Sequence, residues 1–344
     1  MPLNVVTLVF SDNETCFVRC SDTESVVQAA GRHGLKLLVD CREGACGTCK
    51  AICRSGEFVL DDFSREALLP SELRDGAVLT CRMAPQTDCV VEFDYPISQA
   101  RRGKAAPPRG VVVSRMTRLA DDVVELALAA QDGQPFDFLP GQYANLELPS
   151  GGLWRSYSYA TKPGNPETHF AIRLIPDGAM SAWLTERAQV GDRLKLAGPY
   201  GRFFLRKPHR RLLMVAGGTG LAPMLSMLDA LSARSIDPLA VDVVFGVTCS
   251  ENIFYQERLA ASLACFARHR AAVAAVAADA GWSGLVGTAV DALKTVDVGA
   301  ETDAYLCGPL AMIEAARDWL RTRGLSDQAI FTEAFLPTTN SKAA

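Results

Sequence analysis

Alternating hydrophobic and polar residues near the N-terminus predict a small, β-rich domain. The first two alternating runs are separated by the polar residues 11–14, which predicts a β-hairpin. A helical spacing of apolar residues follows and ends at Gly34, where a helix is expected to stop. The expected elements are strands at 5–10, 15–20, 78–83 and 89–95 and a helix at 24–33. Together they predict a first domain over residues 1–95.

Residues 96–108 interrupt this pattern with Pro, Ala, Gly and basic residues, a composition typical of a linker. Six β-like runs then follow, separated by turns that contain Gly or Pro. Evenly spaced strands with such turns predict an antiparallel barrel over residues 109–207. The expected elements are strands at 109–118, 122–129, 142–148, 153–161, 169–176 and 192–197 and a helix at 180–188.

Strands and helices alternate over residues 208–344, which predicts a parallel sheet with helices on both faces. The first strand is an apolar run, and the helix after it carries Met224, Leu228 and Leu231 on one face. The expected elements are strands at 211–216, 241–247, 271–278, 304–307 and 329–333, with further helices near 253–265, 284–293 and 309–323. The predicted fold class is therefore multidomain, with α+β and α/β parts.

Composition is that of a globular chain with two or three domains. Of its 344 residues 49% are hydrophobic and 22% are charged. The chain contains no run of 18 or more apolar residues, so a transmembrane helix is not expected. The N-terminus has no basic segment ahead of an apolar run, so no signal peptide is expected. Eleven cysteines argue for a reducing compartment, and the cytoplasm is the expected location.

The clearest chemical motif is a set of four cysteines with the plant-type [2Fe–2S] spacing, in which four thiolates hold two irons. The set is Cys41, Cys46, Cys49 and Cys81. Gly44 and Gly47 permit a tight loop that brings backbone N–H groups close to the sulfurs. Zinc and a redox dithiol are the alternatives, but structural zinc sites favour two Cys-x2-Cys pairs, and this chain has one. We favour Cys81 over Cys53 as the fourth ligand, because the separation between Cys49 and Cys81 in the sequence leaves room for a pair of strands that returns the chain to the cysteine loop.

Charge is distributed unevenly along the chain. Residues 1–95 contain nine Lys or Arg and fifteen Asp or Glu, a net −6, which leaves +2 for the rest. An acidic electron-carrying domain often docks on a basic partner, although an ordinary solvated surface has the same charge. Asp40 and Glu43 beside the cysteine loop are where docking is expected. No basic stripe of the nucleic-acid-binding type is recognised except Arg101, Arg102 and Lys104 in the linker, so no nucleic-acid partner is expected. No membrane partner is expected either.

Two segments of the predicted barrel carry candidate binding groups. Residues 155–158, Arg-Ser-Tyr-Ser, offer a guanidinium for phosphate, an aromatic ring for stacking and hydroxyls for hydrogen bonds. Residues 178–181, Gly-Ala-Met-Ser, open a helix whose free N–H groups can hold a diphosphate. Taken alone, the first segment is more often plain barrel surface and the second more often a simple helix cap.

The third domain opens with a strand, a glycine loop at 217–223 and a helix, an order that predicts a dinucleotide-type phosphate site. Pro223 suits the first helical turn, although the glycine spacing differs from the Rossmann fingerprint. Residues 307–309, Cys-Gly-Pro, follow a later strand at the carboxyl edge of the sheet, where ligands bind in open α/β folds. Cys307 is therefore a candidate site residue, with a buried small residue as the alternative.

With these three domains in order, almost the whole chain resembles ferredoxin–NAD(P)⁺ reductase-type flavoproteins with a fused N-terminal plant-type ferredoxin. It is most similar in pattern to the reductase components of benzoate, toluate and anthranilate dioxygenases. The resemblance implies a β-grasp-like ferredoxin domain, a six-stranded antiparallel flavin-binding barrel and a parallel, doubly wound nucleotide-binding domain. It also implies FAD rather than FMN, and a terminal Rieske-type, non-haem iron dioxygenase as the electron acceptor.

The resemblance assigns roles to individual residues. Arg155 matches the residue for the flavin diphosphate, Tyr157 the ring on the isoalloxazine and Ser158 the group near its N5. The implied flavin-binding set is Arg155, Ser156, Tyr157, Ser158, Arg173, Leu174, Gly178, Met180, Ser181 and Phe335. The implied pyridine-nucleotide set is Gly217, Gly218, Thr219, Gly220, Leu221, Pro223, Cys307, Gly308 and Pro309. The implied catalytic residues are Ser158, Cys307 and Glu333.

NADH is the expected electron donor. NADPH enzymes of this type carry Ser-Arg after the third strand, whereas this chain has Ala278 and Asp279 there and Glu251 after the second strand. These acids would repel a 2′-phosphate. A flavin takes two electrons from a nicotinamide and passes them on singly, so the predicted path is NADH to FAD to [2Fe–2S] to an external oxygenase. The alternatives are a monooxygenase reductase, of the phenol or methane hydroxylase type, and a non-catalytic iron–sulfur redox sensor.

Overall fold

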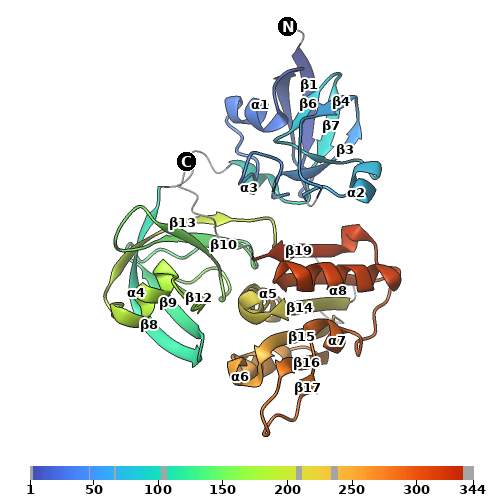
Figure 1. Ribbon diagram of the computed structural model, residues 1–344. Coiled ribbons are helices and arrows are strands. Elements are labelled where there is room, and N and C mark those ends of the chain that lie inside the picture. Colours follow the sequence, from blue (N-terminus) through green and yellow to red (C-terminus); the bar gives the residue numbers. More distant parts are fainter. Residues whose placement is uncertain are drawn as a thin grey trace. The chain divides into compact units, whose positions relative to one another are not determined.

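The structure is a computed structural model that describes residues 3–45, 47–65, 67–101, 107–206, 211–233 and 239–335 (Figure 1). The chain divides into two compact units. The first unit contains residues 1–107 together with the short segment 200–202, and the second contains residues 108–199 and 203–344.

The first unit is built on a five-stranded sheet with the order β2-β1-β7-β3-β5. The first strand pairs antiparallel with β2 and parallel with β7, while β3 is antiparallel to both β5 and β7. Strands β4 and β6 form a separate antiparallel pair. The strands are β1 (Leu3–Val9), β2 (Thr15–Ser21), β3 (Lys50–Ser55), β4 (Phe58–Leu60), β5 (Ala77–Leu79), β6 (Met83–Pro85) and β7 (Cys89–Glu92). The helices are α1 (Val26–Arg32), α2 (Pro70–Arg74) and α3 (Ile97–Arg101).

Three features of this unit differ from the predicted elements. Strand 78–83 is divided, because β5 pairs with β3 and β6 pairs with β4, so Cys81 lies in the turn between them. Helix α3 occupies part of the expected linker, because Ala100 is buried and its carbonyl accepts the N–H of Lys36. The short elements β3, β4 and α2 have no counterpart in the predicted set.

The second unit begins with a six-stranded barrel sheet in the order β11-β10-β13-β8-β9-β12. Its strands pair antiparallel, and alternate residues such as Leu126, Leu128 and Phe170 fill the interior. Phe138 and Tyr159 stack in this core with ring centroids 3.8 Å apart. The elements are β8 (Arg109–Ala120), β9 (Val123–Ala130), β10 (Tyr143–Glu147), β11 (Trp154–Ser158), β12 (Glu167–Arg173), α4 (Ala179–Glu186) and β13 (Arg193–Tyr200).

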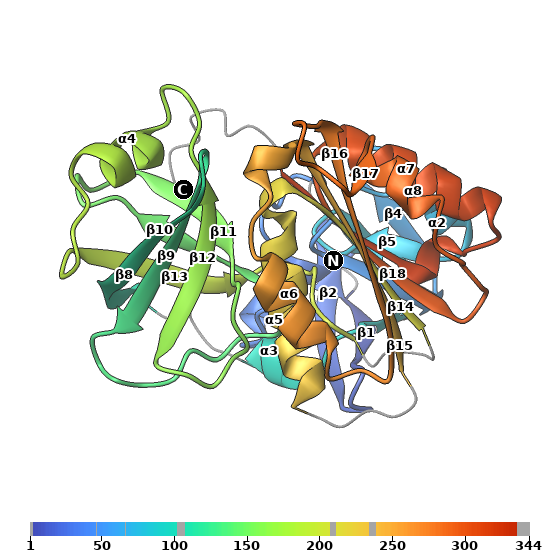
Figure 2. The ribbon, with the colours of Figure 1, turned by 90° about the horizontal axis from the view of Figure 1, so that it is seen from below.

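The remainder of the second unit is a parallel sheet in the order β17-β16-β15-β14-β18-β19. Alternate residues of β14 face opposite sides, so Met214 packs with α5 and α6, and Val215 packs with α7 and α8 (Figure 2). The strands are β14 (Arg211–Gly217), β15 (Ala240–Cys249), β16 (Arg268–Ala277), β17 (Leu285–Val286), β18 (Thr302–Gly308) and β19 (Ile330–Ala334). The helices are α5 (Leu221–Ser232), α6 (Gln256–Leu263), α7 (Ala289–Leu293) and α8 (Leu310–Thr322), with 3₁₀ turns η1 (Gly218–Gly220), η2 (Ser250–Asn252) and η3 (Asp327–Ala329).

Two helix starts in this sheet domain differ from the prediction. Residues 285–286 form an edge strand instead of the start of a helix, and α7 begins only at the capping box of Thr288 and Asp291. Helix α6 begins at Gln256 because Tyr255 before it has a left-handed backbone, with φ of 58°. The central strand β14 has β15 on one side and β18 on the other, so the direction in which successive strands are added to the sheet reverses at β14. Ligands of open α/β sheets bind at the carboxyl end of such a switch point.

Candidate functional site

The cysteine loop of the first unit is shaped to surround sulfur with N–H groups. Glu43 and Ala45 donate their backbone N–H groups to Cys41 Sγ over 3.5 and 3.4 Å. Gly44 has φ of +71°, and a Cβ there would lie 2.8 Å from Phe63 Cβ. The loop therefore needs glycine at this position, both for its backbone conformation and for space.

Two of the predicted ligands meet directly. Cys49 Sγ donates to Cys81 Sγ across 3.2 Å, and this hydrogen bond lowers the pKa of Cys81 to about 6. The hydroxyl and N–H of Thr80 both donate to the Cys49 carbonyl, at 2.8 and 3.0 Å, which ties the turn that carries Cys81 to the loop. Cys46 lies outside the described residues, and among the described His, Cys, Asp and Glu side chains no three gather as a metal site.

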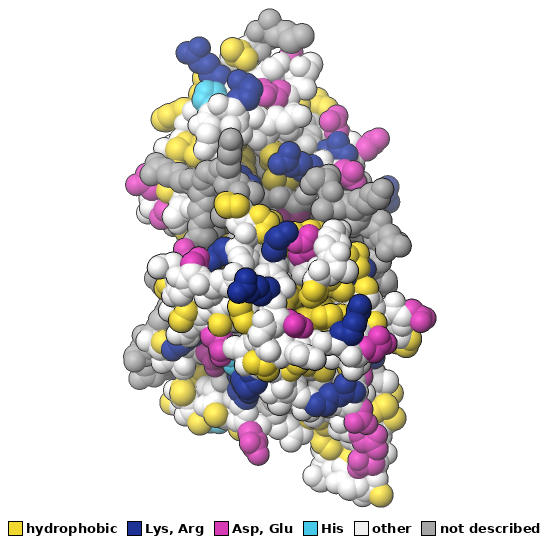
Figure 3. Space-filling model, turned by 90° about the vertical axis from the view of Figure 1, so that its left-hand side faces the viewer, with side chains coloured by type: hydrophobic (Ala, Val, Ile, Leu, Met, Phe, Trp, Pro, Cys, Tyr) yellow, Lys and Arg dark blue, Asp and Glu magenta, His cyan; other side chains and the backbone are white. Residues whose placement is uncertain are grey.

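The residues present fit an iron–sulfur cluster by their chemistry. Thiolates with lowered pKa values and backbone N–H donors are what a cluster with bridging sulfides requires. Asp40 and Glu43 are exposed beside the loop, with the exposed Arg42 between them. Acidic and basic side chains are likewise interspersed over the face of the molecule in Figure 3.

In the barrel, β11 presents the predicted flavin-binding residues on alternating faces. Arg155 and Tyr157 share one face, where Tyr157 packs on the barrel core and burial raises its pKa. Ser156 points the other way and donates to Asn145 Oδ1 at 2.6 Å. A half-buried ring beside a guanidinium suits a ligand that has an aromatic plane and phosphates.

The start of α4 offers uncapped backbone groups. Gly178 is its N-cap and makes no side-chain cap bond, so N–H groups of the first turn stay available to an anion. Ser181 Oγ instead accepts the N–H of Ile175 at 2.8 Å and shapes the turn. Arg173 pairs with Asp122 Oδ2 at 3.0 Å, and the Leu174 N–H donates to the Asp122 carbonyl, so the Arg173 guanidinium and the Leu174 N–H both have partners within the chain.

The glycine loop after β14 packs against the end of β18. A Cβ on Gly220 would lie 2.2 Å from the Cys307 carbonyl, and a Cβ on Gly308 would lie 3.0 Å from Gly217 Cα. Gly218, with φ of +54°, faces open space instead. Thr219, Leu221 and Pro223 continue this loop into α5. The two segments thus join at the switch point, and the open side at Gly218 is free for the backbone to approach a diphosphate.

The three predicted catalytic residues converge in the second unit. Ser158 Oγ, at the end of β11, donates to Glu333 Oε2 at 3.3 Å. Glu333 in β19 is in register with Cys307 in β18. Cys307 is fully buried, and burial with the nearby Glu333 charge raises the pKa of its thiol. Cys307 therefore contributes packing at the end of β18. Phe335 directly after β19 is 39% exposed.

Glu251 and Asp279, the two acids on which the prediction of NADH rests, lie at the same edge of the sheet. Glu251 is in η2 after β15, and Asp279 follows β16. Ser250 Oγ accepts the N–H of Asp279 at 3.0 Å, which holds the two segments together.

A buried ionic network joins the barrel to helix α6, and sequence analysis missed it. Glu125 on β9 accepts the hydroxyl of Tyr255, pairs with Arg115 at 3.0 Å and lies 3.4 Å from His169. Arg258 on α6 donates to the carbonyl of Ala160, which follows β11. The available signal was a single acid within the apolar strand 123–130. This network positions β11, and with it Ser158, against the nucleotide-binding part.

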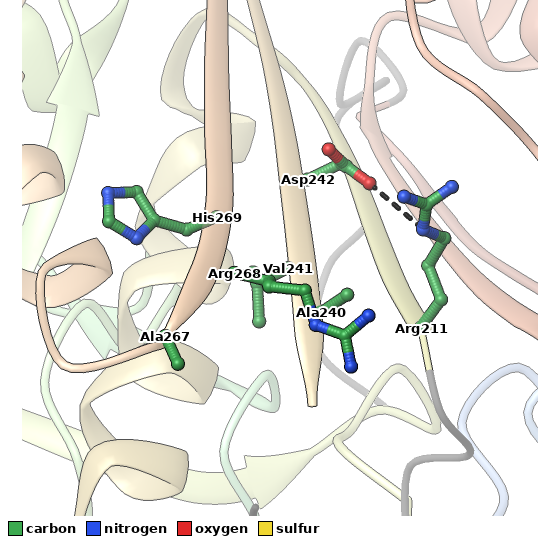
Figure 4. Close-up of a pocket in the computed structure, with 7 residues that line it drawn as sticks. All are labelled: Arg211, Ala240, Val241, Asp242, Ala267, Arg268 and His269. Carbon is green, nitrogen blue, oxygen red and sulfur yellow. Dashed lines mark ion pairs between the residues drawn. The ribbon is translucent and has the colours of Figure 1, made fainter. Parts of the chain in front are cut away.

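A hollow of about 320 Å³ opens at the amino ends of β14, β15 and β16, on the opposite edge of the sheet from the glycine loop (Figure 4). Arg211 points to Asp242 there, with 3.3 Å between Nε and Oδ2. Because this edge is remote from the switch point, the hollow does not belong to the predicted nucleotide site.

Three family models match the chain in order. They are the 2Fe-2S iron-sulfur cluster binding domain over residues 9–86, the oxidoreductase FAD-binding domain over residues 110–205 and the oxidoreductase NAD-binding domain over residues 214–318. Fold and domains together define an NADH-dependent iron–sulfur flavoprotein oxidoreductase, with [2Fe–2S], FAD and NAD as its cofactors.

Relatives match over the full length of the chain. The chain is 36% identical to the 2-halobenzoate 1,2-dioxygenase electron transfer component of Burkholderia cepacia, over 98% of this chain and 99% of the relative. It is 34% identical to the toluate 1,2-dioxygenase electron transfer component of Pseudomonas putida, over 95% and 96%. The chain belongs to this family of electron transfer components of oxygenase systems.

A solved structure shares the whole architecture. The cytochrome P450 reductase of Amycolatopsis is 27% identical, with a TM-score of 0.67 over 96% of this chain and 99% of that one. In the part of the chain that the structure describes, no helix is long and apolar enough to cross a membrane.

Proposed function

We propose that this chain delivers electrons from NADH, through FAD and a [2Fe–2S] cluster, to the terminal component of an aromatic-ring-hydroxylating dioxygenase of Rieske type. The observation that carries the proposal is the match of 34–36% identity along nearly the full chain to electron transfer components of halobenzoate, toluate and anthranilate dioxygenases. We place the protein in the cytoplasm, in keeping with its eleven cysteines.

The proposed cluster ligands are Cys41, Cys46, Cys49 and Cys81. In the described part of this set, Cys49 and Cys81 are in contact, and the N–H groups of Glu43 and Ala45 point at Cys41. These donors stabilise negative charge on sulfur, which favours the reduced state of a bound centre. The exposed acids Asp40 and Glu43 beside the loop provide charges that a basic partner surface would attract.

The proposed flavin site combines β11 with the start of α4. Arg155 supplies positive charge for the diphosphate, the helix start at Gly178 supplies N–H groups, and Tyr157 supplies a ring for the isoalloxazine. When bound, the flavin accepts two electrons at once and releases them singly. The chain's own part is to hold Ser158, at the end of β11, beside Glu333 in β19, so that a hydroxyl and a carboxylate orient the reacting rings.

The proposed pyridine-nucleotide site is the switch point beyond β14 and β18. The glycine loop receives the diphosphate, and the carboxylates of Glu251 and Asp279 at the same edge disfavour a 2′-phosphate. Fully buried Cys307 packs beside this loop, with its carbonyl next to Gly220.

The test is a visible spectrum of the purified protein before and after NADH, with iron, sulfide and flavin analysis. The proposal requires flavin and iron–sulfur absorption that NADH bleaches. A colourless zinc protein, or a flavin band that NADH leaves unchanged, would refute it. Turnover is then reconstituted with a Rieske dioxygenase that acts on a benzoate-type substrate.

A second candidate acceptor is a multicomponent monooxygenase. The chain is 35% identical to methane monooxygenase component C of Methylosinus trichosporium, over 82% of this chain and 84% of the relative. The two candidates are separated by supplying the same reduced protein to a Rieske dioxygenase and to a monooxygenase hydroxylase. Faster product formation by the hydroxylase would favour the second candidate.

A further inference from the structure

Two cysteines of the first unit lie together without belonging to the proposed cluster ligands. Cys53 is on β3 and Cys89 begins β7, and these strands are antiparallel neighbours. The register shifts between Cys53 and Ser55, where Cys53 faces Val91 and Ser55 faces Val90. A bulge bends its strand and redirects side chains, so Cys53 is placed toward the start of β7.

The register places Cys53 and Cys89 on the same face of these neighbouring strands, because Cys53 is opposite Val91 and Cys89 lies two residues before Val91. Cys53 Sγ donates to the Ser55 carbonyl at 3.3 Å, and Cys89 Sγ lies 3.3 Å from the Thr87 carbonyl. A Cβ on Gly56 would lie 2.6 Å from Cys89 Sγ, so the chain after β3 closes tightly over this sulfur. The backbone of both strands therefore fixes Cys53 and Cys89 as diagonal neighbours across the pair.

The two thiols differ in exposure and acidity. Cys89 is only 2% exposed, whereas Cys53 is partly exposed. The interaction with Cys89 outweighs burial and lowers the pKa of Cys53 to about 7. The same interaction, together with burial, raises the pKa of Cys89. A reachable thiolate beside a protected thiol is the arrangement of an attacking and a resolving cysteine.

We infer that Cys53 and Cys89 form an oxidisable pair, which hydrogen peroxide converts into a disulfide that joins β3 to β7. The Cys53 thiolate attacks one peroxide oxygen, so an S–O bond forms, the O–O bond breaks and the leaving hydroxide takes a proton to become water. Cys89 then loses its proton and attacks the Cys53 sulfur, which releases a second water. Two thiols give up two electrons, and the peroxide is reduced.

The site is distinct from electron transfer but adjacent to the ligand loop. Strand β3 begins at Lys50, directly after Cys49, and β7 lies between β1 and β3 in the sheet. A bond between β3 and β7 therefore fixes the strand that carries the end of the loop. The inference concerns thiol chemistry alone and holds whether or not the terminal oxygenase is correctly assigned.

The experiment treats the full-length, cofactor-loaded protein with hydrogen peroxide, blocks free thiols with iodoacetamide and maps the peptides by mass spectrometry. We expect one linked pair of peptides that contains Cys53 and Cys89, released by dithiothreitol. Cys265→Ser, which removes an exposed cysteine elsewhere, is the matched control and should leave the link intact. In Cys89→Ser we expect Cys53 to be trapped by dimedone as the sulfenic acid.

The peptide map of the oxidised wild-type protein tests the inference even where a variant folds poorly. Alkylation of both Cys53 and Cys89 after a peroxide dose that oxidises Cys265 would overturn the inference. Conversion of Cys53 to a sulfinic acid with Cys89 still alkylated would overturn it as well. The visible spectrum is recorded throughout, so that loss of cofactors is detected independently of the thiols.

Discussion

The hydroxyl of Ser158 donates a hydrogen bond to Oε2 of Glu333 across 3.3 Å, although 175 positions separate the two residues in the chain. The bond joins the end of barrel strand β11 to β19, the last strand of the parallel sheet. Because Glu333 is also in register with Cys307, residues from three distant segments meet at one place. Placing a hydride donor over its acceptor requires this kind of fixed meeting point.

Removing the Ser158–Glu333 bond should slow flavin reduction more than it weakens NADH binding. A hydrogen bond to a charged group contributes about 1.5–3 kcal/mol. We therefore expect Ser158→Ala and Glu333→Gln to reduce the rate of flavin bleaching by NADH about 10–100-fold. Stopped-flow absorbance over a range of NADH concentrations separates rate from affinity. Thr332→Ala, an exposed neighbour on β19, is the control, and an equal loss in it would contradict the assignment.

Replacing Cys81 should remove the cluster without stopping flavin reduction. Cys81→Ser deletes a predicted thiolate from the turn between β5 and β6, which lies in a different unit from the barrel. We expect iron and sulfide to be lost while NADH still bleaches the flavin. Cys53→Ser is the matched control and should keep the cluster. A full two-iron spectrum in Cys81→Ser would show that the ligand assignment is wrong.

A methyl group on Gly220 should disrupt the nucleotide loop. The added Cβ would lie 2.2 Å from the Cys307 carbonyl, and the atoms it would meet are backbone atoms of Cys307 and Gly308, which have little room to move. Overpacking of this kind costs about 1–3 kcal/mol. We expect Gly220→Ala to raise the KM for NADH at least about tenfold and to lower the melting temperature. Gly299→Ala, where a Cβ meets nothing within 4 Å, should change neither.

The charge at Asp279 should decide between the two nicotinamide cofactors. We expect Asp279→Arg to increase kcat/KM for NADPH relative to NADH by about tenfold or more, because a repulsive carboxylate is replaced by a phosphate-binding guanidinium. Steady-state kinetics with both cofactors measure the ratio. Asp318→Arg on exposed α8 makes the same change of charge away from this edge and should leave the ratio unaltered.

The folding stability of the protein should fall as the pH is lowered, because the Glu125 carboxylate becomes protonated. Burial alone would raise its pKa, but the hydrogen bonds from His169 and Tyr255 prevail and lower it to about 2. A folded-state pKa below the unfolded value of about 4.3 stabilises the protein above that value. This contribution, of about 3 kcal/mol, is lost as pH falls toward 2.

The Glu125 contribution is measured by urea unfolding of the wild type and Glu125→Gln between pH 3 and pH 7. We expect the variant to be less stable at pH 7, and we expect the difference in free energy of unfolding between wild type and variant to narrow as pH falls. A gap that stays constant with pH would contradict the ionic role. The partner His169 has its pKa raised by Glu125 and Glu167 against the effect of burial, so its own contribution is present at low pH and is lost above its raised pKa.

Hydrophobic periodicity was sufficient for most of the fold, because long strands and helices bury one face regularly. The barrel and the parallel sheet follow the predicted order for this reason. Elements stabilised by distant partners had no such signal. Strands β4 and β6 have three residues each and exist because they pair with one another, and α3 forms because it packs on the first unit.

Motif spacing identified candidate residues but could not supply their relationships. The contact of Cys49 with Cys81 agrees with the predicted ligand pattern, whose assignment stays a prediction. The bond between Ser158 and Glu333, the network around Glu125 and the pair of Cys53 with Cys89 all join residues far apart in sequence. Such contacts depend on tertiary packing, which the local pattern of one chain does not encode.

During synthesis, β1 leaves the ribosome well before its parallel partner β7, which starts only at Cys89. Until then β1 has β2 alone, and an isolated two-stranded hairpin is marginal in water. Strand β3 awaits the same partner, so the five-stranded sheet closes when β7 emerges, while the barrel is still incomplete. All four predicted ligands precede β7. A nascent chain is therefore able to receive iron and sulfide before its flavin-binding part has been made.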